Sequence, residues 1–253
     1  MFQPIVARRF LAAILAALLA FAPAGPALAQ DAWRFEGTPY LWAAGMKGDV
    51  GVGRLSATGV EMTFPDILKD LRIGFMGSLE GRKGDAGFLL DLVYMKLDQD
   101  QPAPAPFLGD VQARPTQAAY TGAFTYRVSK GAMPVDLLAG VRVNDVKLDL
   151  SLSSSALAPG GRRVGRSRTW TDGFVGARVE VPVAPRWTLT AYGDIGAGGS
   201  DSTWQVMAGA NYALSPKSTA KFGYRQVRVD YHRDEFLFDM ASGGLYGGLA
   251  LQF

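Results

Sequence analysis

Two residues near the end of the chain have the types and spacing needed for acid–base chemistry. Asp230 and His232 are separated by one residue, so on a β-strand their side chains project from the same face. In such a pair the histidine serves as general base and the carboxylate orients its ring. His232 is the single histidine and the chain has no cysteine, which excludes a cysteine nucleophile and a thiolate metal site. We expect no metal and no cofactor.

The spacing of Asp230 and His232 resembles half of the catalytic site of the omptin proteases, ten-stranded membrane barrels that activate water between an Asp–His pair and an Asp pair. The resemblance implies His232 as general base and Asp230 as its orienting partner. It also requires a second acidic pair, for which Asp98 and Asp100 are the only loose match. Because the charged run 233–235 follows directly, a solvated loop is favoured over a catalytic site.

A second hydrolase class would pair a serine with the histidine on a barrel wall, as lipid A deacylases and outer-membrane phospholipases do. No serine lies near His232 in the sequence. We therefore predict a protein that is not an enzyme, with an outer-membrane hydrolase, omptin-like or lipid A-modifying, as the alternative.

The elements that position these residues follow an N-terminal targeting segment. Arg8 and Arg9 precede an apolar run over 10–21, and Ala27-Leu28-Ala29 forms a small-x-small cleavage site. This pattern predicts a cleaved secretory signal peptide over 1–29 and a mature domain over 30–253. The signal removes two of the 26 basic residues and none of the 23 acidic ones, so the formal charge falls from +3 to +1. That small charge gives no support to nucleic-acid binding.

The mature sequence excludes a helical membrane protein. After Ala29 no run of 18 apolar residues occurs, and the best candidate, 87–95, is short and contains Asp91. The 31 glycines also argue against a helical bundle. A chain of this kind is either soluble or crosses a membrane as a β-barrel.

Apolar and polar residues alternate along almost the whole mature chain, which indicates β-strands. Within 189–195, for example, apolar residues alternate with Thr190, Tyr192 and Asp194. The same pattern covers 73–82, 88–94, 120–128, 137–143, 175–181, 204–212, 220–224 and 245–253. Short turns at 83–85, 130–132, 184–186 and 215–217 alternate with longer connections at 46–71, 99–112, 153–167, 197–202 and 232–237. This organisation predicts an all-β, transmembrane antiparallel β-barrel with ten strands and both termini in the periplasm.

Two other strand numbers remain open. Alternating residues within 46–64 could add a hairpin and make twelve strands, and eight is the last alternative. Aromatic residues near the strand ends favour a membrane barrel, because such residues form girdles at the two interfaces. Those toward the short turns are Trp33, Tyr126, Trp187, Tyr212 and Phe253, and those toward the long connections are Trp42, Tyr94, Trp170 and Trp204.

The ending GGLYGGLALQF resembles the terminal strand of outer-membrane β-barrel proteins, which the barrel assembly machinery reads as a sorting signal through residues such as Tyr246, Leu249, Leu251 and Phe253. The stretches TPYLW at 38–42, DIL at 66–68 and AYGDIG at 191–196 resemble a family of proteobacterial outer-membrane barrels without an assigned activity. The resemblance implies a porin-like membrane protein of the Gram-negative cell outer membrane. Its implied partners are outer-membrane lipid, lipopolysaccharide and the assembly machinery; the sequence predicts no oligomeric state.

Charged residues on the polar face predict two layers inside the barrel. The lower layer contains Arg34, Glu36, Glu80, Arg127, Asp136, Glu180 and Lys221. The upper layer, the predicted lumen charge network, contains Asp91, Arg142, Arg178, Asp194 and Arg225, with Tyr40 and Tyr246 at the same height. Each layer is nearly neutral, and long side chains fill most of the bore of a ten-stranded barrel. We therefore predict a structural protein or one that passes only small solutes.

Two connections have features of their own. Arg162, Arg163, Arg166 and Arg168 occur in one long predicted loop, where guanidinium groups could bind lipopolysaccharide phosphates. Residues 63–71 predict one or two helical turns with an apolar stripe, and a cap on the rim is favoured over a lid.

Overall fold

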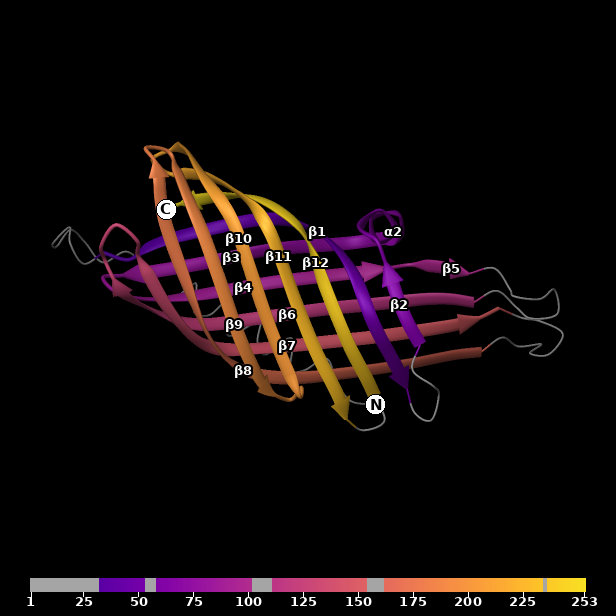
Figure 1. The fold of residues 1–253 in the computed structure, drawn as a ribbon. Helices are drawn as coiled ribbons and strands as arrows, with labels where there is room; N and C mark the ends of the chain where they lie inside the picture. The colour runs from indigo at the N-terminus through magenta and orange to yellow at the C-terminus, as the bar shows by residue number, and fades with distance from the viewer. Residues whose placement is uncertain (1–31, 53–57, 102–110, 154–161, 234–235) are drawn as a thin grey trace. The chain divides into compact units, whose positions relative to one another are not determined.

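The structure, a computed structural model, describes residues 32–52, 58–101, 111–153, 162–233 and 236–253. The predicted signal peptide over 1–29 lies outside these residues. The described residues are almost entirely β-structure (Figure 1). Among the described residues, no helix is long and apolar enough to cross a membrane.

Ten long strands form a closed antiparallel barrel, which confirms the predicted fold and strand number. In wall order they are β1 (Arg34–Val52), β3 (Leu71–Lys83), β4 (Ala86–Leu97), β6 (Val111–Ser129), β7 (Val135–Leu152), β8 (Arg162–Ala184), β9 (Trp187–Gly198), β10 (Ser202–Ser215), β11 (Ser218–Arg233) and β12 (Phe236–Gln252). β12 pairs with β1 from Glu36↔Gln252 to Val52↔Phe236 and closes the ring.

The two ends of the barrel differ, as predicted. Tight turns join β3–β4, β6–β7, β8–β9 and β10–β11 at one end, which we name the turn end. Gly84 has a φ of 58° in the first of these turns, a conformation that glycine adopts without steric cost. The other end, the loop end, holds the remaining connections. The connection from β7 to β8 is shorter than predicted because β8 already begins at Arg162, and β6, β7 and β8 extend beyond their neighbours there (Figure 1).

The hairpin suspected within 46–64 exists, but it does not enlarge the barrel. β2 (Thr58–Met62) pairs only with the loop-end part of β1, from Met46↔Met62 to Val50↔Thr58. A second short strand, β5 (Gln99–Gln101), pairs among the described residues with β6 alone. The twelve-strand alternative is therefore wrong.

The predicted helical turns are present as α2 (Phe64–Asp70), which connects β2 to β3. Thr63 caps its N-terminus, and the Thr63 side chain and backbone hydrogen bonds hold the pKa of Asp66 below its ordinary value. Of the predicted apolar stripe, Ile67 is buried, whereas Phe64, Leu68 and Leu71 are exposed. α2 thus begins beside Gly45 of β1, and most of its apolar stripe is uncovered.

Side chains alternate between an apolar outer surface and a polar interior. On β7, for instance, Asp136, Leu138 and Arg142 face inward and are buried, whereas Leu137 and Val141 face outward and are about half exposed. The outward face is apolar around the wall, as lipid contact requires.

Aromatic residues collect on the outward face near the turn end. Phe35 stacks on Phe253 with ring centroids 6.0 Å apart, and Trp187 packs on Tyr212 at 4.8 Å. Toward the loop end the predicted girdle is wrong for two residues. Trp170 is only 5% exposed and faces inward, and the Trp42 indole N–H donates to the carbonyl oxygen of Arg225 inside the barrel.

Candidate functional site

A layer of ion pairs crosses the barrel interior near the turn end, and Asp136 is its centre. The Asp136 carboxylate is 1% exposed and accepts hydrogen bonds from Arg82 at 2.7 Å, Arg127 at 2.8 Å and Arg178 at 3.1 Å. Arg178 also binds Glu80 at 2.8 Å. We name these residues, together with Glu180, Lys221 and Glu36, the lower layer; Arg127 lies 3.5 Å from Glu180, and Lys221 pairs with Glu36.

A second layer lies further toward the loop end and consists of two connected groups. In the first, Arg142 makes a two-pronged ion pair with Asp194, at 2.8 and 3.2 Å, and the Tyr192 hydroxyl donates to the same carboxylate. The Asp194 carboxylate is fully buried, so Arg142 supplies its compensating charge.

In the second group, Arg225 donates to Asp91 at 3.2 Å, to Gln205 at 2.8 Å and to the Tyr40 hydroxyl at 2.7 Å. The Tyr40 hydroxyl in turn donates to Asp91 at 2.7 Å. We name the two groups the middle layer. With two arginines and two aspartates the middle layer is neutral, and the lower layer, with four basic and four acidic residues, is neutral as well.

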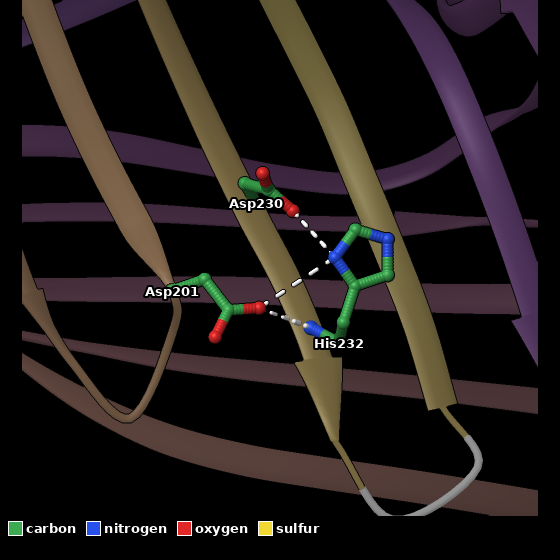
Figure 2. Close-up of side chains that lie close together, drawn as sticks. All are labelled: Asp201, Asp230 and His232. Atoms are coloured by element: carbon green, nitrogen blue, oxygen red, sulfur yellow. Dashed lines mark hydrogen bonds and ion pairs between the residues drawn. The ribbon is translucent and has the colours of Figure 1, made fainter.

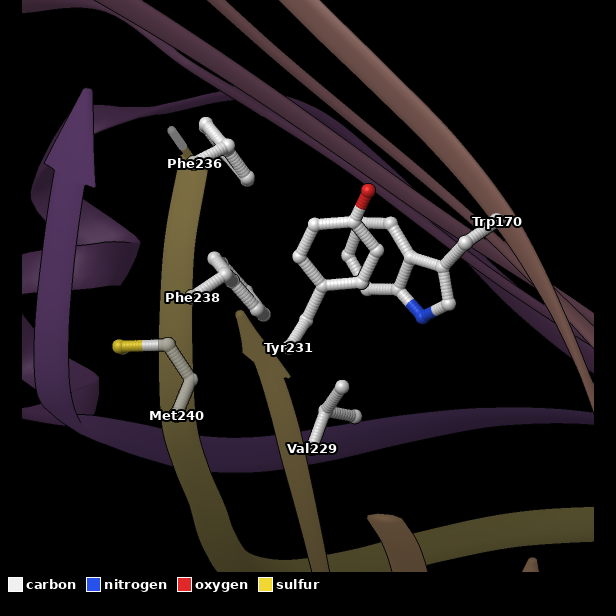
Figure 3. Packing of buried hydrophobic residues seen from close by; sticks show 6 residues of the cluster. All are labelled: Trp170, Val229, Tyr231, Phe236, Phe238 and Met240. Carbon is white, nitrogen blue, oxygen red and sulfur yellow. The ribbon is translucent and has the colours of Figure 1, made fainter. Parts of the chain in front are cut away.

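The loop-end part of the interior is filled by aromatic side chains rather than charges. The Trp170 and Tyr231 rings lie 4.6 Å apart, and Phe238 packs on Trp170 at 5.7 Å (Figure 3). Phe236 and Met240 complete the packing from β12. This aromatic cluster comes from strands that are far apart in the wall, so it spans the bore above the middle layer.

The described residues enclose a cavity on each side of the lower layer. One, of about 130 Å³, lies between the two charged layers; Arg178 and Glu80 line it from below, and Arg142, Arg225 and Tyr40 line it from above. We name it the central cavity. Another, of about 350 Å³, lies on the turn-end side of the lower layer and is lined by Arg82, Arg127 and Glu36 among others.

The predicted lumen charge network is largely assembled, with one correction. Asp91, Arg142, Asp194 and Arg225 form the middle layer, but Arg178 belongs to the lower layer because its partners are Glu80 and Asp136. Of the predicted lower-layer residues, Arg34 is exposed at the start of β1.

Several interior residues were not predicted as members of the network: Arg82, Gln205, Asp172 and Ser200. Arg82 follows Glu80 by two residues on β3, so the two side chains lie on the same face of the strand. The alternation in the sequence could therefore have placed Arg82 in the interior. Asp172 is fully buried and accepts a hydrogen bond from the Ser200 backbone N–H at 2.7 Å.

The suspected acid–base pair lies outside the bore. His232 Nδ1 is 2.8 Å from Asp230 Oδ1 and 3.5 Å from an oxygen of Asp201, a residue of the β9–β10 connection (Figure 2). The His232 backbone N–H also donates to Asp201 at 3.1 Å. On β11 the neighbours Val229 and Tyr231 face inward and are buried, so Asp230 and His232 project from the outer surface.

This lip cluster of Asp201, Asp230 and His232 has three ligand atoms within 4.8 Å of one another, and all three side chains are one third or more exposed. The second acidic residue beside His232 is thus Asp201 and not Asp98, which contacts Arg72 and Arg114. The side chain of Asp100 lies outside the described residues.

The arginine cluster lies on a strand, not in a loop, because β8 begins at Arg162. Arg166 is exposed, and the Arg168 guanidinium lies 5.9 Å from the Phe236 ring centroid. The side chains of Arg162 and Arg163 lie outside the described residues.

No protein-family model matches the chain, and no curated protein matches its sequence. Among solved structures it is similar to the outer membrane protease OmpT of Escherichia coli, with a TM-score of 0.58 and 10% identity over 90% of this chain and 99% of that chain. It also matches the translocator domain of the autotransporter NalP of Neisseria meningitidis, with a TM-score of 0.39 and 11% identity over 98% of this chain and 96% of that chain. The match to Ail of Yersinia pestis has a TM-score of 0.36 and 11% identity, covering 88% and 99%.

These structural neighbours are outer-membrane β-barrel proteins of Gram-negative bacteria. At 10% identity the similarity to OmpT supports the barrel fold and extends no further.

Proposed function

We propose that the protein is an integral outer-membrane β-barrel whose bore is closed along its axis. Its role is structural, or it passes only small solutes, and it catalyses no reaction. The apolar outward surface and the turn-end aromatic residues support residence in a bilayer.

One observation carries the closed-bore proposal: three different closures lie in series along the axis. The lower layer, the middle layer and the aromatic cluster each connect side chains from well-separated strands. Arg178 reaches Glu80 across the interior from β8 to β3, and Arg225 reaches Asp91 from β11 to β4. A water-filled channel would keep such charges on the wall, as in porins.

The orientation that we propose places the turn end and both termini of the barrel domain in the periplasm, because short turns lie there in bacterial barrels. The extended β6–β8 strands then project outward, where Arg166 could meet lipopolysaccharide phosphates. The barrel assembly machinery is the proposed partner during folding, and we propose no nucleic-acid partner.

Membrane residence is tested by fractionation and by electrophoresis of unheated and boiled samples. We expect the protein in the outer-membrane fraction, with faster migration before boiling because a closed barrel resists detergent unfolding. Recovery in the soluble periplasmic fraction would contradict the proposal.

Deleting Phe253 should reduce the folded, membrane-inserted fraction severalfold. Phe253 closes the ring: its backbone N–H donates to the Phe35 carbonyl at 3.1 Å, and its ring stacks on Phe35. The measurement is the ratio of fast-migrating to boiled-form protein in isolated membranes. Phe253→Tyr, which retains an aromatic ring, is the matched control, and an unchanged yield after deletion would count against a role in assembly.

A hydrolase with its site in the lip cluster is the second candidate, favoured by the 2.8 Å contact between His232 and Asp230. The outward projection and exposure of both side chains disfavour it, because a buried site strengthens acid–base chemistry.

Replacing His232 with Ala should leave the free energy of unfolding within about 0.5 kcal/mol of the native value, since exposed pairs contribute little. Peptide and lipid A hydrolysis by the variant should equal those of the native protein. A hydrolytic activity that the native protein has and His232→Ala lacks would reverse the ranking of the two functions.

A further inference from the structure

Backbone pairing between β1 and β3 stops part-way along the wall. The two strands pair from Arg34↔Arg82 to Pro39↔Gly77, and β1 next pairs on this side with β2, starting at Met46↔Met62. Among the described residues, no backbone pairing joins Tyr40–Gly45 to Leu71–Met76. We name this part of the wall the β1–β3 interruption; Figure 1 shows β1 turning away from β3 there to follow β12.

The interruption begins directly after Pro39. Pro39 has no backbone N–H, and its carbonyl oxygen lies beside Gly248 of β12, where the β1–β12 register omits Thr38 and Pro39. The missing donor therefore weakens pairing with β12 rather than with β3. The upper border is close packed, because a Cβ atom at Gly45 would lie 3.1 Å from the carbonyl oxygen of Met62. The interruption is therefore bounded below by the Pro39↔Gly77 pair and above by the connection from β2 to α2.

Burial differs at this place from the rest of the wall. Leu71 to Phe75 are all exposed, so the alternation of covered and uncovered residues that other strands show is lost at the start of β3. The outward side chains around the interruption are apolar: Leu41 is 79% exposed, Phe75 58% and Ile73 51%. These residues present an apolar rim to the lipid.

The interruption lies at membrane depth, in the half of the barrel nearer the loop end. The six residues of β1 in the interruption, 40–45, cover a height of about 15 Å at about 3.3 Å per residue and a tilt near 40°. This height is smaller than the apolar band of a membrane barrel, which is about 25 Å tall. Irregular backbone at such a depth is tolerated where it borders a cavity, because lipid offers no hydrogen bonds.

The central cavity borders the lower end of the interruption. Its lining includes Tyr40, the first residue of the interruption, and Thr38, Ser78 and Glu80 of the paired segment below it, whereas residues 41–45 and 71–76 are not among its lining residues. The lower layer closes the cavity toward the turn end, and the middle layer and the aromatic cluster close it toward the loop end. Toward the interruption the cavity is bounded by Tyr40, whose hydroxyl is hydrogen-bonded to Arg225 and Asp91, so sideways entry between β1 and β3 passes this side chain.

The chemistry of the lining indicates the ligand class. Leu89, Met207 and the Tyr246 ring give the cavity an apolar part. Arg178 and Arg225 also line it, and each is mostly buried with an Nε–H that has no acceptor among the described residues. Because the surrounding acids and bases compensate one another, an added charge would be unpaired.

We propose that the β1–β3 interruption admits small uncharged molecules, each with an apolar ring or chain and an acceptor oxygen, from the outer part of the membrane into the central cavity. A volume of about 130 Å³ suits a molecule the size of phenol, since an apolar cavity of about 150 Å³ holds benzene. This inference rests on the proposed membrane location and names the solute class and its path.

The test uses labelling of an introduced cysteine, because the native chain has none. Ser78→Cys places a thiol in the cavity lining, and Met207→Cys is the second variant if the first fails to fold. In lipid vesicles, N-ethylmaleimide, which is uncharged and dissolves in lipid, should label the thiol at least tenfold faster than a sulfonated maleimide present on both sides. Excess phenol should slow the labelling severalfold.

Ala43→Trp in the same background places an indole at the interruption and should slow labelling by N-ethylmaleimide at least tenfold. Ala208→Trp adds the same outward indole where β10 is fully paired with β9 and β11, and should leave the rate unchanged. An equal effect of the two substitutions, no protection by phenol, or rapid labelling by the sulfonated reagent would overturn the inference. Failure of the membrane proposal is seen separately, as protein that does not insert and does not change mobility on boiling.

Discussion

Replacing Asp136 with Ala should lower the free energy of unfolding by about 3–5 kcal/mol, the range measured when one partner of a buried ion pair is removed. Arg82, Arg127 and Arg178 all bind this carboxylate, and its side chain is 1% exposed. The variant would leave three guanidinium groups close together with reduced compensation. The measurement is urea unfolding of the protein refolded into phospholipid vesicles, followed by tryptophan fluorescence.

Glu61→Ala is the matched control, because it removes one carboxylate from a pair with Lys47 in which both side chains are at least 70% exposed. Such a pair contributes about 0–1 kcal/mol. Asp136→Asn should lie between the two, since the amide oxygen still accepts from an arginine. If Asp136→Ala were no more destabilising than Glu61→Ala, the lower layer would not stabilise the barrel.

The importance of Asp136 shows what the sequence can and cannot predict about this interior. Alternation alone correctly assigns Asp136, Arg142 and Asp194 to the inward face, because the period of a strand is two residues. The partners depend on the stagger between strands. Arg178 lies well above its own turn, yet the register pairs it with Asp136, close to a different turn. Barrel strands tilt and are staggered by a fixed shear, so height counted from each turn misplaces such residues.

The face of the strand also explains why Trp42 and Trp170 were wrongly assigned to the outer aromatic girdle. Trp170 is in phase with Arg178 and Glu180 on β8, and Trp42 is in phase with Glu36 and Tyr40 on β1, so parity places both inside. Nearness to a strand end suggested a girdle, but the face of the strand decides the environment. Asp201 could not be predicted as a partner of His232, because only the β10–β11 pairing Ser202↔Asp230 brings their connections together.

The strand number was predictable because turn residues mark every hairpin at the turn end, whereas the β1–β3 interruption was not. Pro39 is visible in the sequence, but proline at an edge or a bulge has several structural outcomes. The alternation within β1 does not show which strand pairs with each of its edges, so the change from β3 to β2 along one edge cannot be predicted from it.

The native protein in a planar bilayer should show little or no steady conductance, and any current should be far below that of a general porin. A ten-stranded barrel is little wider than the eight-stranded size that side chains fill, and the lower layer, middle layer and aromatic cluster obstruct the bore in series.

Obstructions in series have a testable consequence, because removal of one of them should leave the current unchanged. Arg142→Ala combined with Asp194→Ala removes both members of a middle-layer pair without leaving a buried charge alone. This double variant should stay closed, because the Arg225–Asp91 pair of the middle layer, the ion pairs around Asp136 and the rings around Trp170 remain. A large, stable current from the native protein would contradict the closed bore and support a general porin instead. A current from the double variant alone would show that the Arg142–Asp194 pair blocks the bore and that the remaining closures do not replace it.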